Sequence, residues 1–451
     1  MSINPPHSSQ EYRRPVRNAS LDRRILAITV PAFAALICEP LMLMADTAIV
    51  GHLGRAELAA LGAASTILST VVGLCVFLAY GSTATVARHQ GAGDERRALE
   101  AALGGVWLAL LIGMALGTLA ALTARPLGAA LASSDRVADL TADYLLVAAA
   151  SIPAVLLVLA ATGALRGVLD LRTPLVVMII ANVLNVVLTV ALVYGADLGM
   201  RGAALGLVLA QWAAALALVG QVIRRSRHTH ASARLRWPDV ARAGRDGVPL
   251  LLRTLSLRAV LLLATLVAAG FGDASLAAHQ IATTIVMLLA FALDAFAIAA
   301  QTLTGHSLGA GDAEETREVT RRVIAWGFGF GLAAGVLLAV SAPWVARAFS
   351  PDADVRAAAV PALLIVAAIQ PLSGVVFVLD GVLIGAGDGV YLAWAGLVAL
   401  LIYAPVALWI RETDAGFTWL WGAYALFQAT RWVTLWVRQR GDRWLVLGAA
   451  R

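Results

Sequence analysis

The chain has 451 residues, of which 60% are hydrophobic and only 14% are charged. Soluble domains carry about 25% charged residues, so this composition excludes an ordinary soluble protein and indicates a polytopic membrane protein. The formal net charge of +6 comes from arginine, because the chain contains no lysine. Membrane proteins concentrate basic residues in their cytoplasmic loops, so we expect no nucleic-acid partner. The two cysteines, Cys38 and Cys75, lie in apolar segments and predict neither a disulfide nor a metal site.

The first apolar segment, residues 25–53, is long enough to cross a bilayer, which takes roughly 20 residues. Glu39 and Asp46 lie within it, and a carboxylate at the centre of a membrane helix costs about 2.5–3.5 kcal/mol on insertion scales. Because they are seven residues apart, we expect both near one helical face. Pro31 and Pro40 each remove a backbone hydrogen bond and favour bending. This pattern is typical of an ion-coupled transporter, although a polar pair that only packs helices is the alternative.

Twelve apolar segments follow a polar, basic tail, residues 1–23, which is expected to be disordered. The interruptions are short and rich in Gly, Pro and charge, and alternating strand patterns are missing, so each segment is predicted to be a helix. The first segment is too long for a signal-peptide core, and we expect it to be retained. The segments lie near 24–52, 57–87, 98–123, 137–165, 173–195, 202–223, 247–270, 274–307, 321–346, 355–384, 389–410 and 417–437.

The distribution of arginine predicts the orientation of these helices. With an even number of spans, both termini lie on one side, and that side carries 25 arginines against 7 on the other. Arg253 and Arg258 lie inside a segment. The positive-inside rule therefore predicts a multi-pass protein of the plasma (inner) membrane with both termini in the cytoplasm.

The sequence also repeats itself with an offset of 218 residues, at which 51–60 resembles 269–278 and 88–94 resembles 306–312. Six helices in each copy predict two six-helix lobes related by a pseudo-two-fold axis along the membrane normal. Such an architecture favours a central cleft and alternating access, whereas duplication that gave only a scaffold is the alternative. The predicted regions are the N-terminal tail (1–23), the N-lobe (24–223), a cytoplasmic linker (224–246), the C-lobe (247–437) and the C-terminal tail (438–451).

Several motifs resemble those of the multidrug and toxic compound extrusion (MATE) transporters. The segment from Pro31 to Asp46-Thr-Ala-Ile-Val-Gly-His-Leu-Gly resembles their first helix, and the doubled Gly-Ala-Gly-Asp loops fit as well. Leu379-Asp380-Gly-Val-Leu-Ile-Gly-Ala is similar to the DinF-like branch. Across roughly residues 20–437, the resemblance implies a V-shaped pair of bundles that exports cationic or amphipathic compounds against proton or sodium entry. We expect a monomer that needs no other cofactor, and no use of ATP because no nucleotide-binding domain is present.

The resemblance also implies a coupling site. In the DinF-like branch the aspartate of the first helix, here Asp46, is the proposed cation-coupling carboxylate, supported by an Asn and an Asp on the fifth helix. Asn185 is kept here, Thr189 stands where the family often has Asp, and Asn182 lies one turn earlier. A proton needs one titratable group and sodium prefers several oxygen ligands, so the missing acid favours a proton. Glu39 is a further candidate, and Pro31 and Pro40 would let the first helix bend.

Polar residues of the C-lobe form a second group of candidates. Unpaired charges are costly in lipid, so Arg253 is expected to pair with Asp294 or Asp380. The alternative is that these acids and Gln301 line the cavity and attract cationic substrates. Packing or structural roles are expected for His279, Gln280 and His306. The Gly-Ala-Gly-Asp loops lack the Lys-Ser/Thr of a phosphate-binding loop and are expected to be tight turns.

Three functions compete at this point. The first is a cation-coupled multidrug exporter. The second is a flippase for a lipid or a lipid-linked glycan, which would need a strongly basic central cavity, whereas intramembrane arginine is expected only in residues 247–270. The third, a membrane enzyme, would need clustered histidines or acids at one membrane edge, but the seven histidines are scattered. The exporter is favoured, and no enzyme activity is expected.

Overall fold

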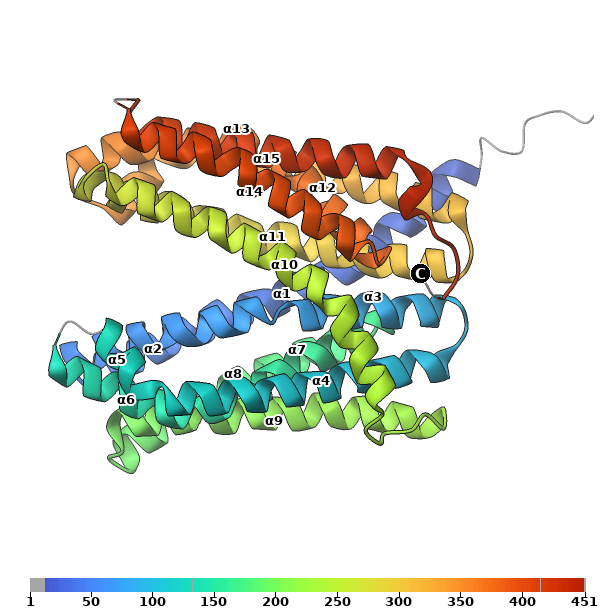
Figure 1. Cartoon of the computed structure of the whole chain (residues 1–451), viewed down its shortest axis with the longest axis horizontal. Helices are drawn as coiled ribbons and strands as arrows, with labels where there is room; N and C mark the ends of the chain where they lie inside the picture. The colour runs from blue at the N-terminus through green and yellow to red at the C-terminus, as the bar shows by residue number, and fades with distance from the viewer. Residues whose placement is uncertain (1–12, 132–133, 414, 450–451) are drawn as a thin grey trace, which may run out of the picture.

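The computed structural model describes residues 13–131, 134–413 and 415–449, and every regular element in those ranges is helical (Figure 1). The first half contains α1 (Arg13–Gly51), α2 (Arg55–Leu74), α3 (Phe77–Gly91), α4 (Glu95–Leu122), α5 (Ala124–Leu131), α6 (Asp135–Ala148), η1 (Ala149–Ser151), α7 (Ile152–Gly167), α8 (Arg172–Val190), the π-helical turn η2 (Ala191–Gly195) and α9 (Gly199–His228). The second half contains α10 (Trp237–Ala269), α11 (Asp273–Gly309), α12 (Ala313–Phe349), α13 (Ala353–Gly385), α14 (Gly389–Glu412), α15 (Phe417–Arg440) and η3 (Asp442–Trp444).

Two predicted segments are each broken into two helices. The segment 57–87 becomes α2 and α3, separated at Cys75, whose backbone N–H is shared between the carbonyls of Val71 and Val72. The segment 137–165 becomes α6, η1 and α7, and Pro153 in the first turn of α7 cannot donate to the preceding turn. The short helix α5 was not predicted from the sequence.

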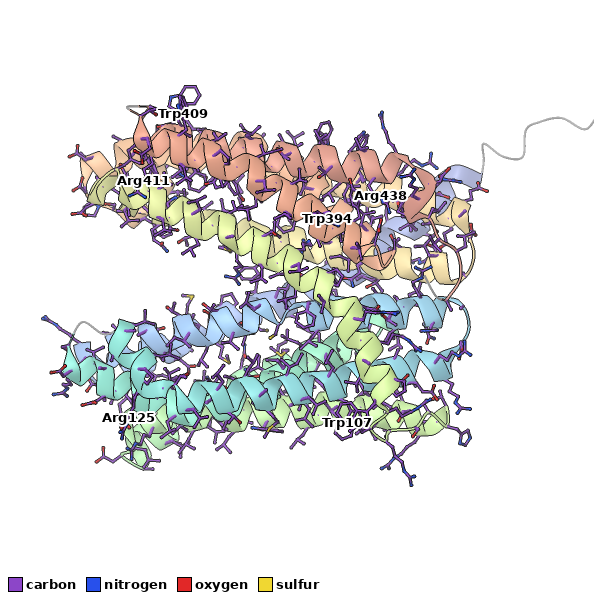
Figure 2. All side chains as sticks on the ribbon, in the orientation of Figure 1. Trp107, Arg125, Trp394, Trp409, Arg411 and Arg438 are labelled. Atoms are coloured by element: carbon purple, nitrogen blue, oxygen red, sulfur yellow. The ribbon has the colours of Figure 1, made fainter. Side chains whose placement is uncertain are left out.

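Helix length and composition agree with a membrane protein of twelve spans. Within the described ranges, eleven helices or joined pairs of helices are long and apolar enough to cross a membrane. The twelfth predicted segment is α15, which is 24 residues long but carries Gln428 and Arg431. Outward-facing side chains such as Trp394 and Trp409, more than 60% exposed on the second bundle, give the outer surface its apolar character (Figure 2).

The helices form two bundles that diverge toward one end of the molecule, which is the V-shaped arrangement that the family resemblance implies (Figure 1). Helices α2–α9 belong to the first bundle and α11–α15 to the second. We call the end where the bundles spread apart the open end and the other the closed end. The closed end contains the turns between α3 and α4 and between α11 and α12, and it is where α1 begins and where the C-terminal segment lies.

The first long helix of each half crosses from one bundle to the other. Near its start α1 packs against the second bundle, where Arg24 pairs with Glu315 at 2.9 Å. The first turns of α10 pack against α3 and α4 of the first bundle, so closely that a Cβ on Gly247 would lie 2.7 Å from the Phe77 ring. This matching exchange of α1 and α10 is the arrangement expected for two repeats in the same orientation.

Glycines of the repeated Gly-Ala-Gly-Asp motifs bring α3 and α11 together at the closed end. A Cβ on Gly91 would lie 2.1 Å from the carbonyl oxygen of His306, and one on Gly309 would lie 2.1 Å from that of Arg88. The motif aspartate Asp94 then caps α4, as Asp312 caps α12. The prediction of tight turns is confirmed, and the turns also hold the bundles in backbone contact.

Part of the N-terminal tail is helical, contrary to expectation, and the linker and the C-terminal segment also contain regular structure or fixed contacts. Helix α1 begins at Arg13, inside the tail that was expected to be disordered. In the predicted linker, only residues 229–236 lie between α9 and α10. The C-terminal segment is docked rather than free, because the Arg88 guanidinium donates to the carbonyls of Val446 (2.5 Å), Gly448 and Ala386 (both 2.9 Å).

Candidate functional site

Asp46 is buried in the first bundle, where α8 covers its side of α1. Only 5% of Asp46 is exposed, and Nδ2 of Asn185 donates to its Oδ1 at 2.8 Å. Thr189 lies one turn further along α8, fully buried and close enough to act on the Asp46 carboxyl. The Thr189 hydroxyl forms no hydrogen bond with any described residue. The structure therefore brings together Asp46, Asn185 and Thr189, the arrangement that the resemblance implied.

Two further contacts attach α1 to α8 on either side of Asp46. Asn182 donates to the backbone carbonyl of Cys38 at 2.6 Å, and Tyr194 donates to that of Ile49 at 2.7 Å. Asn182 thus holds the turn of α1 that contains Pro40 and does not contact Asp46. Both prolines lie within a continuous helix.

Glu39 does not share the environment of Asp46. It is exposed, and no described residue forms a hydrogen bond or ion pair with it, although the two acids are only seven residues apart. The spacing of seven residues keeps both near one helical face, but only Asp46 is buried. Because α8 covers Asp46 but leaves Glu39 open, the two carboxylates differ in exposure.

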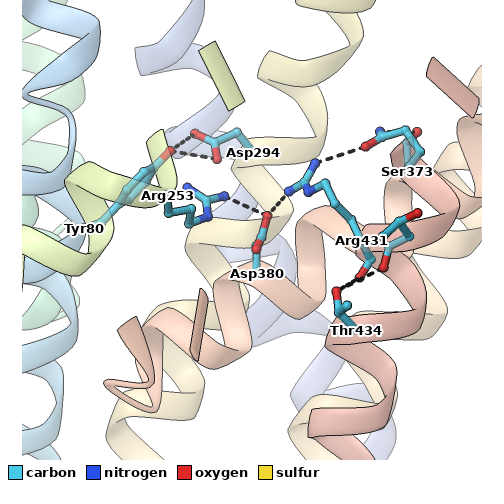
Figure 3. Close-up of polar contacts among 9 residues, drawn as sticks. Tyr80, Arg253, Asp294, Ser373, Asp380, Arg431 and Thr434 are labelled. Carbon is cyan, nitrogen blue, oxygen red and sulfur yellow. Dashed lines mark hydrogen bonds and ion pairs between the residues drawn. The ribbon is translucent and has the colours of Figure 1, made fainter. Parts of the chain in front are cut away.

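A second polar cluster lies in the C-lobe and is centred on Asp380 of α13 (Figure 3). Arg253 of α10 pairs with its Oδ2 at 2.7 Å, and Arg431 of α15 makes a second ion pair with the same oxygen. Arg431 also donates to Gln428 at 3.1 Å, which in turn donates to Ser373 at 3.0 Å. The predicted pairing of Arg253 with an acid is confirmed for Asp380, and every member of this group lies within the helix bundle.

Asp294 lies beside this cluster but has a different partner. The Tyr80 hydroxyl of α3 donates to both Asp294 oxygens, at 3.1 and 3.2 Å, so the contact joins the two lobes (Figure 3). Gln301, two turns further along α11, donates to the Tyr80 backbone carbonyl at 2.6 Å. Arg166 of α7 is 8% exposed and is the cation that acts most strongly on Asp294.

Sequence reasoning missed Tyr80, Arg166 and Arg431. Arg431 is the only charged residue inside the predicted segment 417–437, which could have marked it as intramembrane rather than cytoplasmic. Arg166 directly follows the segment 137–165. When Arg166 and Arg431 are counted as residues of the bundle, 23 arginines remain on the side of the termini against 7 on the other side. The predicted orientation is therefore unchanged.

The expectation that intramembrane arginine is limited to the seventh helix is also wrong. Arg166 and Arg431 join Arg253, but Asp294 and Asp380 lie among them. The centre of the protein is a mixed cluster of charges and not a uniformly basic surface. This distribution does not provide the strongly basic cavity that a flippase for pyrophosphate-linked lipids would need.

The remaining polar candidates have packing contacts, with one exception. His279 is 4% exposed, lies 3.3 Å from the hydroxyls of Thr265 and Thr283, and packs against Trp421. His306 lies 2.8 Å from the carbonyl of Gly167 and so links α11 to α7. Gln280 is exposed, which contradicts the packing role expected for it.

Comparison with known proteins agrees with this architecture. A family model described as MatE matches residues 31–191 and again residues 249–409. Both ends of the second match lie 218 residues after those of the first, which is the offset of the internal repeat. The two matches therefore identify the halves as copies of one unit.

Individual relatives cover most of the chain. Protein DETOXIFICATION 44, chloroplastic, from Arabidopsis thaliana is 30% identical over 427 residues, which cover 91% of this chain and 80% of the relative. DNA damage-inducible protein F from Escherichia coli is 27% identical over 435 residues, covering 92% and 91%. The bent form of the Vibrio cholerae MATE transporter VcmN has the same fold, with a TM-score of 0.85 at 21% identity over 94% of this chain and 97% of that one. The chain therefore belongs to the MatE family, the multidrug and toxic compound extrusion transporters, and is a transporter and not an enzyme.

Proposed function

We propose that this transporter is a secondary active exporter of cationic or amphipathic compounds, coupled to proton entry through Asp46. It acts as a monomer in the plasma membrane, with the closed end and both termini in the cytoplasm. The arginine bias supports this orientation, since the positive-inside rule places the arginine-rich loops there. The open end would then face outward, where an exporter releases its substrate.

The observation that carries the proposal is the buried carboxylate of Asp46 with a neutral partner. Asn185 hydrogen-bonds to it, and no cation among the described residues acts on it. A carboxylate buried beside a fixed cation stays ionised, as at Asp380, whereas one with only neutral partners can become neutral by binding a proton. Asp46 therefore has the environment of a proton carrier, and Asp380 that of a structural counter-ion.

The positions of the helices suggest how protonation would drive transport. With Asp46 ionised, the amide of Asn185 orients the carboxylate toward α8. Protonation from the open side removes the charge and weakens this bond, which changes how α1 packs on α8. Pro31 and Pro40 then give α1 places to bend, so that the N-lobe surface narrows and the substrate leaves. A ligand shifts such an equilibrium only by its different affinity for the two states, so the proton and the substrate must both act on α1.

Sodium is a second candidate ion, favoured by two oxygens beside Asp46. The side-chain oxygens Oδ1 of Asn185 and Oγ1 of Thr189 are buried and have no hydrogen-bond partner among the described residues. Together with the carboxylate they could supply three ligands. A pH gradient and a sodium gradient imposed separately on proteoliposomes would distinguish the ions.

The test compares two acid-to-amide variants of the same helix. Asp46→Asn fixes the neutral form at nearly unchanged shape, so we expect normal expression and loss of gradient-driven dye efflux from proteoliposomes. Glu39→Gln is the matched control, because this exposed acid lies outside the Asp46 site, and we expect it to keep most of the efflux. Thr189→Ala should lower efflux only partly. Full gradient-driven efflux by Asp46→Asn would refute the proposal.

A further inference from the structure

We propose that Asp294 is a second proton acceptor. Its ionised form stabilises the contact between the two lobes in the arrangement shown, in which the bundles are separated at the open end. This inference rests on the proposed exporter function and adds to it a control of lobe movement. Asp294 belongs to α11 of the second lobe, but the group that hydrogen-bonds to it, Tyr80, belongs to α3 of the first. The interaction therefore crosses the boundary at which the lobes must move.

The contact lies at the junction of α3 and α11, where the lobes pack together. Near the closed end the two helices touch through backbone, as the spacing at Gly91 and Gly309 shows. Further toward the open end, Gln301 binds the Tyr80 carbonyl, and the Tyr80 hydroxyl then reaches Asp294. Asp294 is thus the last polar attachment of α11 to α3 on the way to the open end among the described residues. A change there acts on the angle between the lobes.

The charges around Asp294 make this attachment depend on protonation. Arg166 comes from α7 of the first lobe and attracts the carboxylate without a direct ion pair, whereas Arg253 and Asp380 come from the second lobe. Helix α12 faces α11 with the aromatic rings of Trp326 and Phe330. Arg24 of α1 and Glu315 of α12 act on α11 near the closed end, at His306.

The two central carboxylates, Asp294 and Asp380, differ in how their charges are compensated. Asp380 is shared by Arg253 and Arg431, and its charge is fully compensated within its own lobe. Among the described residues, Asp294 has a neutral phenol as its only hydrogen-bond donor, and the cation that acts on it most strongly, Arg166, belongs to the other lobe. When Asp294 takes up a proton, the phenol–carboxylate bond becomes an ordinary neutral one and Arg166 loses its attraction to the second lobe. Charge-assisted hydrogen bonds are roughly twice as strong as neutral ones, so protonation loosens the junction.

The direction of this effect suits an exporter. A proton that enters from the open end would weaken the contact that favours the arrangement shown, and so would favour the return of the empty transporter. Loss of the proton on the other side would restore the charge. Asp294 would then supply a coupling step separate from substrate release at Asp46.

The test measures the distance between the lobes at the open end by pulsed electron resonance. Spin labels attach at Asp139→Cys and Ala353→Cys, two exposed positions of α6 and α13, in a full-length chain with Cys38→Ala and Cys75→Ala. At high pH, Asp294→Asn should change the ratio of open to closed populations by about tenfold toward the closed form, which corresponds to 1.4 kcal/mol. Tyr80→Phe should shift the ratio in the same direction by less. Asp273→Asn, an exposed acid at the start of α11, is the control and should not shift it.

The Asp46→Asn background separates this inference from the proposed function. In that variant efflux should be lost, yet the pH dependence of the lobe distance should persist until Asp294→Asn is added. If Asp46→Asn alone removes the pH dependence, or if neither Asp294→Asn nor Tyr80→Phe shifts the ratio, the inference is wrong. If efflux persists in Asp46→Asn while the lobe distances still depend on Asp294, the proposed role of Asp46 fails and the inference stands.

Discussion

The shared carboxylate of Asp380 makes a specific prediction about stability. Two arginines, Arg253 and Arg431, bind one oxygen of Asp380, and all three side chains are 12% exposed or less. Arg253→Ala removes one of the two cations and leaves the pair of Arg431 and Asp380 intact. The loss should therefore resemble that of one hydrogen bond to a charged group, about 1.5–3 kcal/mol.

Asp380→Ala should cost considerably more. Breaking a buried pair by removing one partner costs about 3–5 kcal/mol, because the other charge stays buried without compensation. Here both arginines would be left, so we expect the upper part of that range. In the double variant Arg253→Ala/Asp380→Ala only Arg431 remains uncompensated. Its stability should therefore lie between those of the two single variants, a non-additivity expected of residues in one network.

The assay is the thermal unfolding of purified variants in detergent, followed by the loss of the monodisperse peak in size-exclusion chromatography. Arg317→Ala is the matched control, since Arg317 also pairs with an Asp, but on the surface with its side chain 53% exposed. Such pairs contribute about 0–1 kcal/mol. The reasoning would be refuted if Arg253→Ala destabilised the protein as much as Asp380→Ala, or if the double variant were the least stable of the three.

Three further changes test other parts of the structure. Gly309→Ala would place its Cβ against the Arg88 carbonyl and should lower the unfolding temperature, with a cost on the order of 1–3 kcal/mol; an unchanged temperature would show that the helices separate freely there. Ser232→Cys, between α9 and α10, should resist an impermeant thiol reagent in intact cells, and rapid labelling would reverse the proposed orientation. Asn182→Ala removes one bond to Cys38 and should cost about 0.5–1.5 kcal/mol while efflux continues; complete loss of efflux would make Asn182 part of the ion site.

Hydropathy and repetition were sufficient to predict the helices and their division into two lobes, because each span must satisfy its own backbone in lipid. The breaks at Cys75 and within residues 149–151 were not predicted, since each lies in a segment apolar and long enough to form one continuous span. The N-terminal tail was misjudged, because α1 already begins at Arg13. The docking of the C-terminal segment onto Arg88 could not be predicted, since this contact joins residues about 360 positions apart.

For the candidate site, the sequence predicted residue types better than partners. Asp46 and Asn185 were correctly placed together through the resemblance, and Arg253 was expected to find an acid because an unpaired charge is costly in lipid. Spacing along one helix could not predict that Glu39 is exposed and Asp46 buried, because exposure depends on the neighbouring helix and not on the face alone. The link from Tyr80 to Asp294 could not be predicted, since no local pattern joins helices of different lobes.

The internal repeat shows that the charges at the centre and the acid of the first helix arose at unequal positions of the two copies. At the 218-residue offset, Arg166 of α7 corresponds to Ile384, and Asp380 of α13 corresponds to Thr162. The ends of α7 and α13 keep this register, because the Asp170 N–H donates to the Leu165 carbonyl as the Asp388 N–H donates to that of Leu383. Asp46 likewise corresponds to Ala264, a buried apolar residue of α10. Each copy thus gained its own charges: Arg166 and Asp380 joined the group around Arg253 and Asp294, whereas Asp46, the acid to which we assign the proton, has only neutral partners among the described residues.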